Sequence, residues 1–151
     1  MTVEVRNRQR LLRVDTRLLK ELAVRALKLA GAADYHLSLV LVTDETMAAL
    51  NRQYHHTTGT TDVLSFPYSD AEGEVIISVE RALSQAERFK STPGHEMVLY
   101  LVHGILHLRG YDDATPRERA SMRAAEARLL RQLALRGPLR RLVRRTGKEM
   151  A

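Results

Sequence analysis

The spacing of hydrophobic residues changes several times along the chain, and each change marks the start of another predicted helix or strand. Alternation of apolar and polar residues is typical of strands, whereas apolar residues spaced three and four apart form one face of a helix. The first part of the chain therefore predicts a strand, a helix, a strand and a helix, at residues 3–6, 15–31, 36–42 and 44–54. The last of these should turn Met47, Leu50 and Tyr54 toward the core.

The rest of the chain continues this interleaving of strands and helices. Residues 55–61 follow neither period and predict a loop. Beyond it, two strands are predicted at residues 62–66 and 75–79, and Pro67 should close the first of them. Three helices follow, at residues 80–90, at 96–109, and from 116 to the Gly-Pro break at 137–138.

The helix at 96–109 is the centre of the predicted fold, because it is apolar on nearly every side. Strands interleaved with helices predict an α+β fold, an α/β sandwich in which one mixed sheet of about four strands packs with about five helices. Residues 1–137 should form a single domain, followed by a basic C-terminal tail at residues 138–151.

The composition is that of an ordinary globular domain. The chain has 151 residues, of which 44% are hydrophobic and 28% charged, which excludes wholesale disorder. No apolar run approaches the roughly 20 residues of a membrane helix, and the start of the chain lacks the apolar region of a secretory signal. The absence of cysteine excludes disulfides, thiolate zinc sites and a cysteine nucleophile. We therefore expect a cytoplasmic protein with no membrane partner.

Charge is divided unevenly along the chain. Residues 1–28 carry eight Lys or Arg against three Asp or Glu, and residues 117–151 carry eleven against three, whereas residues 29–116 are acidic. Basic segments that flank a site favour a polyanion such as RNA. Alternatively, they are exposed helix faces that are simply solvated. The five Tyr and two Phe offer few stacking surfaces, so RNA would be held mainly by its backbone.

The segment HGILHLRGYDD, residues 103–113, carries the candidate chemistry. His103 and His107 are four residues apart on the central helix, so both imidazoles project from one face, as two ligands of one Zn²⁺ would. Gly110 can reverse the chain and bring Asp113 within reach as a third ligand, which leaves a fourth position for water. A histidine in an apolar helix can also be structural, but two are costly to bury without partners.

The spacing His-x3-His-x2-Gly-x2-Asp also matches the long zinc motif of metzincin peptidases. In those enzymes a Glu follows the first histidine and acts as the general base. Gly104 occupies that position here, and glycine has no side chain that could accept a proton. A zinc peptidase is therefore disfavoured, and it stays only as a third interpretation.

Three motifs in order resemble the YbeY family of ribosomal RNA maturation endoribonucleases. HGILHLRGYDD is similar to the family's HGxLHLxGYDH, and LNRQYHHTTGTTDVLSFPY at residues 50–68 is similar to its LNxxYRxxxxxTDVLSFP. GEVIISVERALSQA at residues 73–86 resembles the family's GDIxIS strand and the helix after it. Met122 and Glu126 in the next helix also have the family's spacing. The resemblance covers roughly residues 40–130.

The resemblance implies that one Zn²⁺ is held by His103, His107 and Asp113, with Asp113 standing where the family has a third histidine. An aspartate oxygen also binds Zn²⁺, and a carboxylate makes the site more acceptable to Mn²⁺ or another divalent ion. His55 stands where the family has an arginine. Because histidine titrates near neutrality, His55 is a candidate catalytic acid or base, or else a loop residue.

Two functional hypotheses follow from the resemblance. The first is a metal-dependent endoribonuclease that cuts single-stranded RNA in ribosomal RNA processing and ribosome quality control, with ribosomal particles as partners. The second is a non-catalytic ribosome assembly factor whose metal is structural. TDVLSFP would line a substrate groove beside the metal, or would be a core strand with local hydrogen bonds. Asp112 could orient a histidine ligand or cap the turn.

Overall fold

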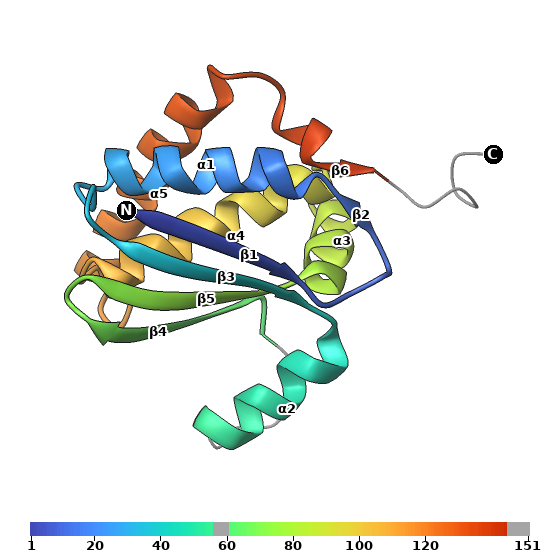
Figure 1. The fold of residues 1–151 in the computed structure, drawn as a ribbon, viewed down its shortest axis with the longest axis horizontal. Coiled ribbons are helices and arrows are strands. Elements are labelled where there is room, and N and C mark those ends of the chain that lie inside the picture. Colours follow the sequence, from blue (N-terminus) through green and yellow to red (C-terminus); the bar gives the residue numbers. More distant parts are fainter. Residues whose placement is uncertain (56–60, 145–151) are drawn as a thin grey trace.

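A mixed four-stranded sheet forms the centre of the computed structural model, which describes residues 1–55 and 61–144 (Figure 1). The strand order is β1-β3-β5-β4. The first three of these run parallel, whereas the edge strand β4 is antiparallel to β5. The strands are β1 (Thr2–Asn7), β3 (His36–Val42), β4 (Val63–Ser69) and β5 (Glu72–Ser78).

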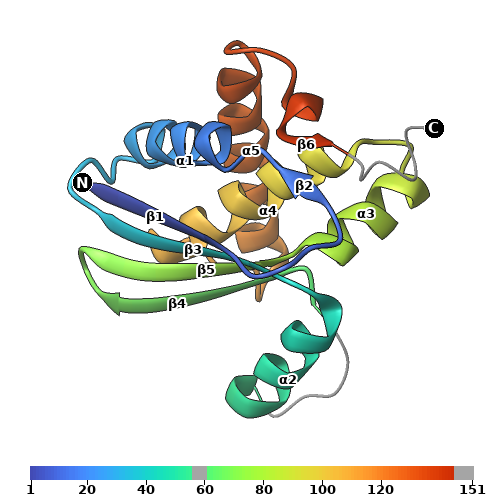
Figure 2. The ribbon, with the colours of Figure 1, turned by 45° about the vertical axis from the view of Figure 1, so that its right-hand side comes forward.

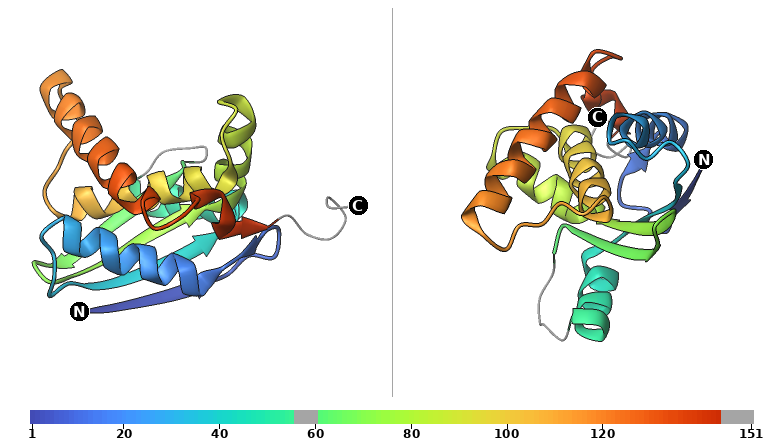
Figure 3. Two further views of the ribbon diagram at one scale, coloured as in Figure 1. Left: turned by 90° about the horizontal axis from the view of Figure 1, so that it is seen from above. Right: turned by 90° about the vertical axis from the view of Figure 1, so that its left-hand side faces the viewer.

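Five α-helices in the described residues pack around this sheet. α1 and α4 cover one face, α5 lies across them, and α2 is on the opposite face (Figure 3). α3 packs against α4 near one end of the sheet (Figure 2). The expected α+β fold is thereby confirmed. The helices are α1 (Thr16–Leu29), α2 (Asp44–His55), α3 (Val79–Arg88), α4 (Pro93–Leu108) and α5 (Pro116–Ala134).

α4 lies at the centre, as its apolar sequence predicts, and ten of its sixteen residues are buried. It begins at Pro93 rather than at residue 96, because the side chain of Thr92 caps it by accepting a hydrogen bond from the backbone N–H of His95 (3.2 Å). Proline suits a first helical turn, so the predicted break at residues 91–94 is the start of this helix. Among the described residues, no helix combines the length and the apolar character needed to span a bilayer.

β4 and α2 each differ from the expectation at one point. β4 continues through Pro67 to Ser69 instead of closing at Pro67. Proline is tolerated there because β4 is an edge strand, and the pairing with β5 becomes irregular between these two residues. Met47 of α2 is fully buried, but Tyr54, expected in the core, is 54% exposed and meets Phe66 edge-on with ring centroids 5.3 Å apart.

The basic segment after Pro138 packs against the domain in its first part. Leu139 and Leu142 lie in a short 3₁₀ helix and are buried in the same core as α1 and α4. β6 (Val143–Arg144) then pairs antiparallel with β2 (Arg13–Val14). The folded domain thus extends beyond the predicted boundary at residue 137, because Leu139 and Leu142 of this basic segment are buried against apolar residues of the core. Residues 145–151 of the predicted tail lie outside the described part.

Candidate metal centre

Two histidines project from the C-terminal half of α4 into a pocket beside β4. His103 and His107 are one helical turn apart, and their rings meet edge to face with centroids 5.0 Å apart. Their side chains are partly buried, at 24% and 32% exposed. The helical spacing therefore places both imidazoles at one side of α4, as the sequence predicts.

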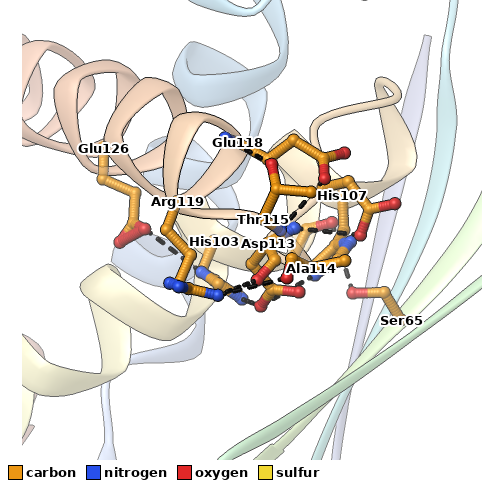
Figure 4. Close-up of polar contacts among 11 residues, drawn as sticks. Ser65, His103, His107, Asp113, Ala114, Thr115, Glu118, Arg119 and Glu126 are labelled. Atoms are coloured by element: carbon orange, nitrogen blue, oxygen red, sulfur yellow. Dashed lines mark hydrogen bonds and ion pairs between the residues drawn. The ribbon is translucent and has the colours of Figure 1, made fainter.

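The loop after α4 brings a carboxylate back to this histidine pair. Gly110 has a φ of 95°, which glycine adopts without strain, and its backbone N–H donates to the carbonyl oxygen of His107 (3.0 Å). Oδ2 of Asp113 then lies 3.7 Å from Nε2 of His107 and 3.9 Å from Nε2 of His103 (Figure 4). One possible ligand atom from each of the three residues lies within 4.8 Å of the others. A group that could hold a metal ion is therefore present.

The start of α5 fixes the other end of this loop (Figure 4). Thr115 and Glu118 form a capping box, in which each side chain accepts a hydrogen bond from the other's backbone N–H, both at 3.1 Å. Arg119 donates to the carbonyl oxygens of Asp113 and Ala114, both at 3.2 Å. The backbone that carries the carboxylate is thus held by α5 as well as by the glycine turn.

Glu126 of α5 orients one of the two histidines. Its Oε1 lies 3.2 Å from Nδ1 of His103, and this hydrogen bond raises the pKa of His103, although burial acts in the opposite direction. When Nδ1 carries the proton, the lone pair of Nε2 is available on the side of Asp113. Asp112, which the sequence offered for this role, instead accepts a hydrogen bond from the backbone N–H of Asp113 (2.9 Å).

Spacing within one motif could not identify Glu126, because it lies 23 residues from His103 on another helix. Its match to the family's pattern was the available signal in the sequence. Sequence reasoning therefore places Glu126 in the family's pattern but does not predict its contact with His103.

The start of β4 forms the opposite wall of the pocket, which has a volume of about 390 Å³. Thr61, Asp62 and Ser65 line it, together with both histidines and Asp113. Leu64, between them, is buried in a small apolar cluster with Met47 of α2. TDVLSFP is therefore both a core strand and a pocket wall. No Lys or Arg lines the pocket among the described residues.

Gly104 allows α4 to approach the sheet closely at this pocket. A Cβ atom at this position would lie 2.8 Å from Cγ1 of Val75 and 3.1 Å from Oγ of Ser65. That serine donates a hydrogen bond to the carbonyl oxygen of Gly104 (3.3 Å). The space that a metzincin glutamate would need is filled by the sheet, which adds a steric argument against a zinc peptidase.

His55, the candidate catalytic residue, is the last residue of α2 rather than part of a loop. α2 lies on the face of the sheet opposite α4 (Figure 3). The structure describes the backbone of His55 but not its side chain, and residues 56–60 lie outside the described part. The catalytic role of His55 therefore stays a prediction.

Comparison with known proteins places the chain in a family. The sequence profile described as "Endoribonuclease YbeY" matches residues 4–134. This chain belongs to the YbeY family. A relative named endoribonuclease YbeY from Anaeromyxobacter dehalogenans is 39% identical, over 87% of this chain and 72% of its own length. Another, from Thermodesulfovibrio yellowstonii, is 33% identical, over 88% of this chain and 98% of its own length.

The structural comparison supports the same fold. A solution structure from Thermotoga maritima superposes with a TM-score of 0.67 at 24% sequence identity, over 88% of this chain and 89% of the other. The family profile and the named relatives confirm the YbeY resemblance of the three motifs and the assignment to a family of RNA-cleaving hydrolases.

Proposed function

We propose that this YbeY-family protein cuts single-stranded RNA in ribosomal RNA maturation, with one Zn²⁺ held by His103, His107 and Asp113. The convergence of Nε2 from both histidines and Oδ2 from Asp113 at one pocket carries this proposal. Two imidazole nitrogens and a carboxylate oxygen, with one side open to a pocket, match the ligand set of a catalytic zinc site better than that of a closed structural one.

This donor set fits zinc and also accepts harder ions. Imidazole suits borderline ions such as Zn²⁺, whereas the carboxylate of Asp113 makes Mn²⁺ more acceptable than a third histidine would. A bound ion supplies Lewis acidity, which favours negative charge on a phosphate oxygen and lowers the pKa of water. Glu126 keeps Nε2 of His103 directed at the site, and Arg119 holds the backbone that carries Asp113.

The pocket suits an unpaired nucleotide. Its volume of about 390 Å³ lies in the range of small-molecule sites and is too small for a double helix. Thr61 and Ser65 offer hydroxyl groups, and Asp62 offers a carboxylate that can accept a hydrogen bond from a ribose 2′-hydroxyl. These features support a single-stranded RNA substrate.

Two further parts of the proposal rest on the family resemblance. His55 would act as an acid or base, because it stands where the family has an arginine and imidazole titrates near neutral pH. Ribosomal particles would be the partners, and ribosomal RNA processing would place the protein in the cytoplasm.

Cleavage of a labelled single-stranded RNA tests the proposal. We expect cutting by the wild-type protein and by Glu87→Ala, a control at an exposed position of α3. We expect no cutting by His107→Ala or by chelator-treated protein, and recovery of the treated sample when Zn²⁺ is added. Equal cleavage by every sample would contradict the metal assignment.

A non-catalytic assembly factor is the second candidate, and one observation supports it. The three residues join the end of α4 to the loop before α5, so an ion held there would tie these elements together. This alternative predicts tight binding to ribosomal particles, no RNA turnover, and unfolding when the metal is removed. If chelation abolishes RNA cleavage but leaves the midpoint of unfolding unchanged, the metal is catalytic and the enzyme interpretation is correct.

A further inference from the structure

Cationic side chains gather away from the metal pocket, in a groove along α1. This α1 groove has a volume of about 680 Å³, and Glu21 is the one acidic residue among the described residues that line it. The metal pocket, by contrast, has no cationic lining residue among those described. The cations of the α1 groove are Arg17, Lys20, Arg25, Lys28 and Arg136.

Folding brings the two basic ends of the chain together at this groove. Four of the five cations lie on α1, whereas Arg136 follows α5, more than a hundred residues later in the sequence. The cations on α1 form a stripe that spans residues 17–28, a length of roughly 16 Å at 1.5 Å per residue. Gathering like charges in a single groove is unfavourable unless an anion compensates them.

Among the described residues, none of these five cations forms an ion pair, and Glu21 is not within ion-pair distance of any of them. Nε of the half-buried Arg25 is itself buried and lacks a hydrogen-bond acceptor there. Buried donors in native proteins normally have an acceptor, and a phosphate oxygen is a strong acceptor for a guanidinium group.

We propose that the α1 groove binds the phosphodiester backbone of the RNA substrate, at nucleotides away from the bond that is cut. This inference rests on the proposed endoribonuclease function. A linear stripe of cations suits a linear polyanion, and none of the described residues that line the groove is aromatic, so they offer no surface for stacking bases. The α1 groove thus attracts the phosphates of the RNA, which the metal pocket does not, because no described Lys or Arg lines that pocket.

One RNA strand can reach both sites. α1 packs against β1, whereas residues of β4 line the metal pocket, and β1 and β4 are the two edge strands of the sheet. Three strand spacings separate β1 from β4, a distance of roughly 14 Å. A single RNA strand that fills both sites must also pass around α4 and α5, so the link between the groove and the pocket is longer than this strand spacing.

Binding of a single-stranded 2′-O-methyl RNA, measured by fluorescence anisotropy over a range of salt concentrations, tests the groove. Lys20 and Lys28 are exposed, so the double variant Lys20→Gln/Lys28→Gln should fold normally. We expect roughly tenfold weaker binding and a salt slope reduced by about 1.4, because each lost phosphate contact removes about 0.7 for a single strand. In the cleavage assay, KM should rise while kcat stays unchanged.

The matched control is Arg88→Gln/Lys90→Gln, which removes the same charge at exposed positions in and just after α3. An unchanged salt slope in the groove variant, or an equal loss in the control, would overturn the proposal. Normal RNA binding with lost binding to ribosomal particles would also overturn it, in favour of an acidic protein partner. Because binding does not require cutting, a failure of the endoribonuclease function would appear separately, as absent cleavage.

Discussion

Glu126 shows how a residue that would not touch the ion can control the site. Its hydrogen bond to Nδ1 of His103 fixes the ring orientation and the tautomer in which Nε2 is free to bind. The contact exists because α4 and α5 pack side by side, with Met122 and Leu129 of α5 buried in the core. Metal affinity should therefore depend on the packing of two helices as well as on the ligands.

We expect Glu126→Gln to bind Zn²⁺ about 10- to 100-fold more weakly than the wild-type protein, while the fold is retained. The amide keeps an oxygen but loses the charge that favours a protonated Nδ1. Competition with a chromophoric chelator measures the affinity, and Glu87→Gln on the exposed side of α3 is the control. Wild-type affinity in Glu126→Gln would show that His103 needs no such partner.

Glu96 provides a pH-dependent prediction at the residue scale. It is 6% exposed on α4, and burial raises its pKa above the usual value, whereas the neighbouring His95 acts in the opposite direction and the Asp62 carboxylate in the same direction. A carboxyl group with a raised pKa in the folded state stabilises the protein while it is protonated, and this stability is lost as pH rises through that pKa.

Glu96→Gln should therefore gain free energy of unfolding, relative to the wild-type protein, as pH rises from 4 to 8. The amide resembles the protonated acid at low pH and avoids burying a charge at high pH. Urea denaturation across this range measures the difference. A difference that is constant with pH, or that falls, would mean that the carboxylate has a compensating partner.

At the scale of elements, the close approach of α4 to the sheet sets the position of the histidines. This contact depends on Gly104, because a Cβ atom there would lie 2.8 and 2.9 Å from the two methyl groups of Val75. Interiors are packed too tightly to absorb such an overlap without a shift of the helix or the strand.

We expect Gly104→Ala to lower the free energy of unfolding by about 1–3 kcal/mol, because of this overlap. It should also weaken metal binding, since His103 directly precedes Gly104 on α4. In the double variant with Val75→Ala, which removes the opposing methyl groups, the added methyl should be tolerated better than in the single one. If Gly104→Ala lowers the free energy of unfolding equally in the wild-type protein and in the Val75→Ala variant, the contact with Val75 is not the cause of the destabilisation.

The spacing of apolar residues predicted the helices and strands that bury one face, or both faces, in the core. The boundaries of β3 were predicted correctly, because this strand lies between β1 and β5 and its last four residues are all buried, which gives an apolar run at residues 36–42. The continuation of β4 past Pro67 was not predictable, because proline is excluded from central strands but not from an edge. Tyr54 follows the helical stripe but lies near the C-terminal end of α2, where it contacts Phe66 and is still 54% exposed.

On the scale of the whole molecule, the C-terminal segment closes the fold against its beginning. The backbone N–H of Asp15 donates to the carbonyl oxygen of Leu142 (2.8 Å), and the Leu142 side chain is fully buried. Sequence periodicity could not show this, because two leucines among arginines form no repeating pattern.

Leu142→Ala should therefore lower the free energy of unfolding by about 2–5 kcal/mol, as expected for a leucine truncated in a core. Leu135→Ala is the matched control, because Leu135 is 79% exposed and its truncation should change stability by less than about 0.5 kcal/mol. Thermal or urea unfolding of both variants gives the comparison. Equal small effects would place the C-terminal segment outside the cooperative unit.

The candidate site was predictable in part for a similar reason. His103, His107 and Asp113 lie within eleven residues, so helix geometry and one glycine turn suffice to bring them together. The pocket wall at Thr61–Ser65 and the Glu126 contact join distant parts of the chain, so that only the family resemblance pointed to them. The α1 groove likewise depends on how the two basic ends meet in space.

Titration of Zn²⁺ into metal-free protein, with RNA cleavage followed at each addition, tests the central claim most directly. The account predicts that cleavage returns in proportion to bound ion and reaches a plateau at one ion per chain. The variant His103→Ala/His107→Ala/Asp113→Ala should neither bind the ion at that site nor recover cleavage. Full cleavage without metal, or one ion still bound by the triple variant, would contradict the account.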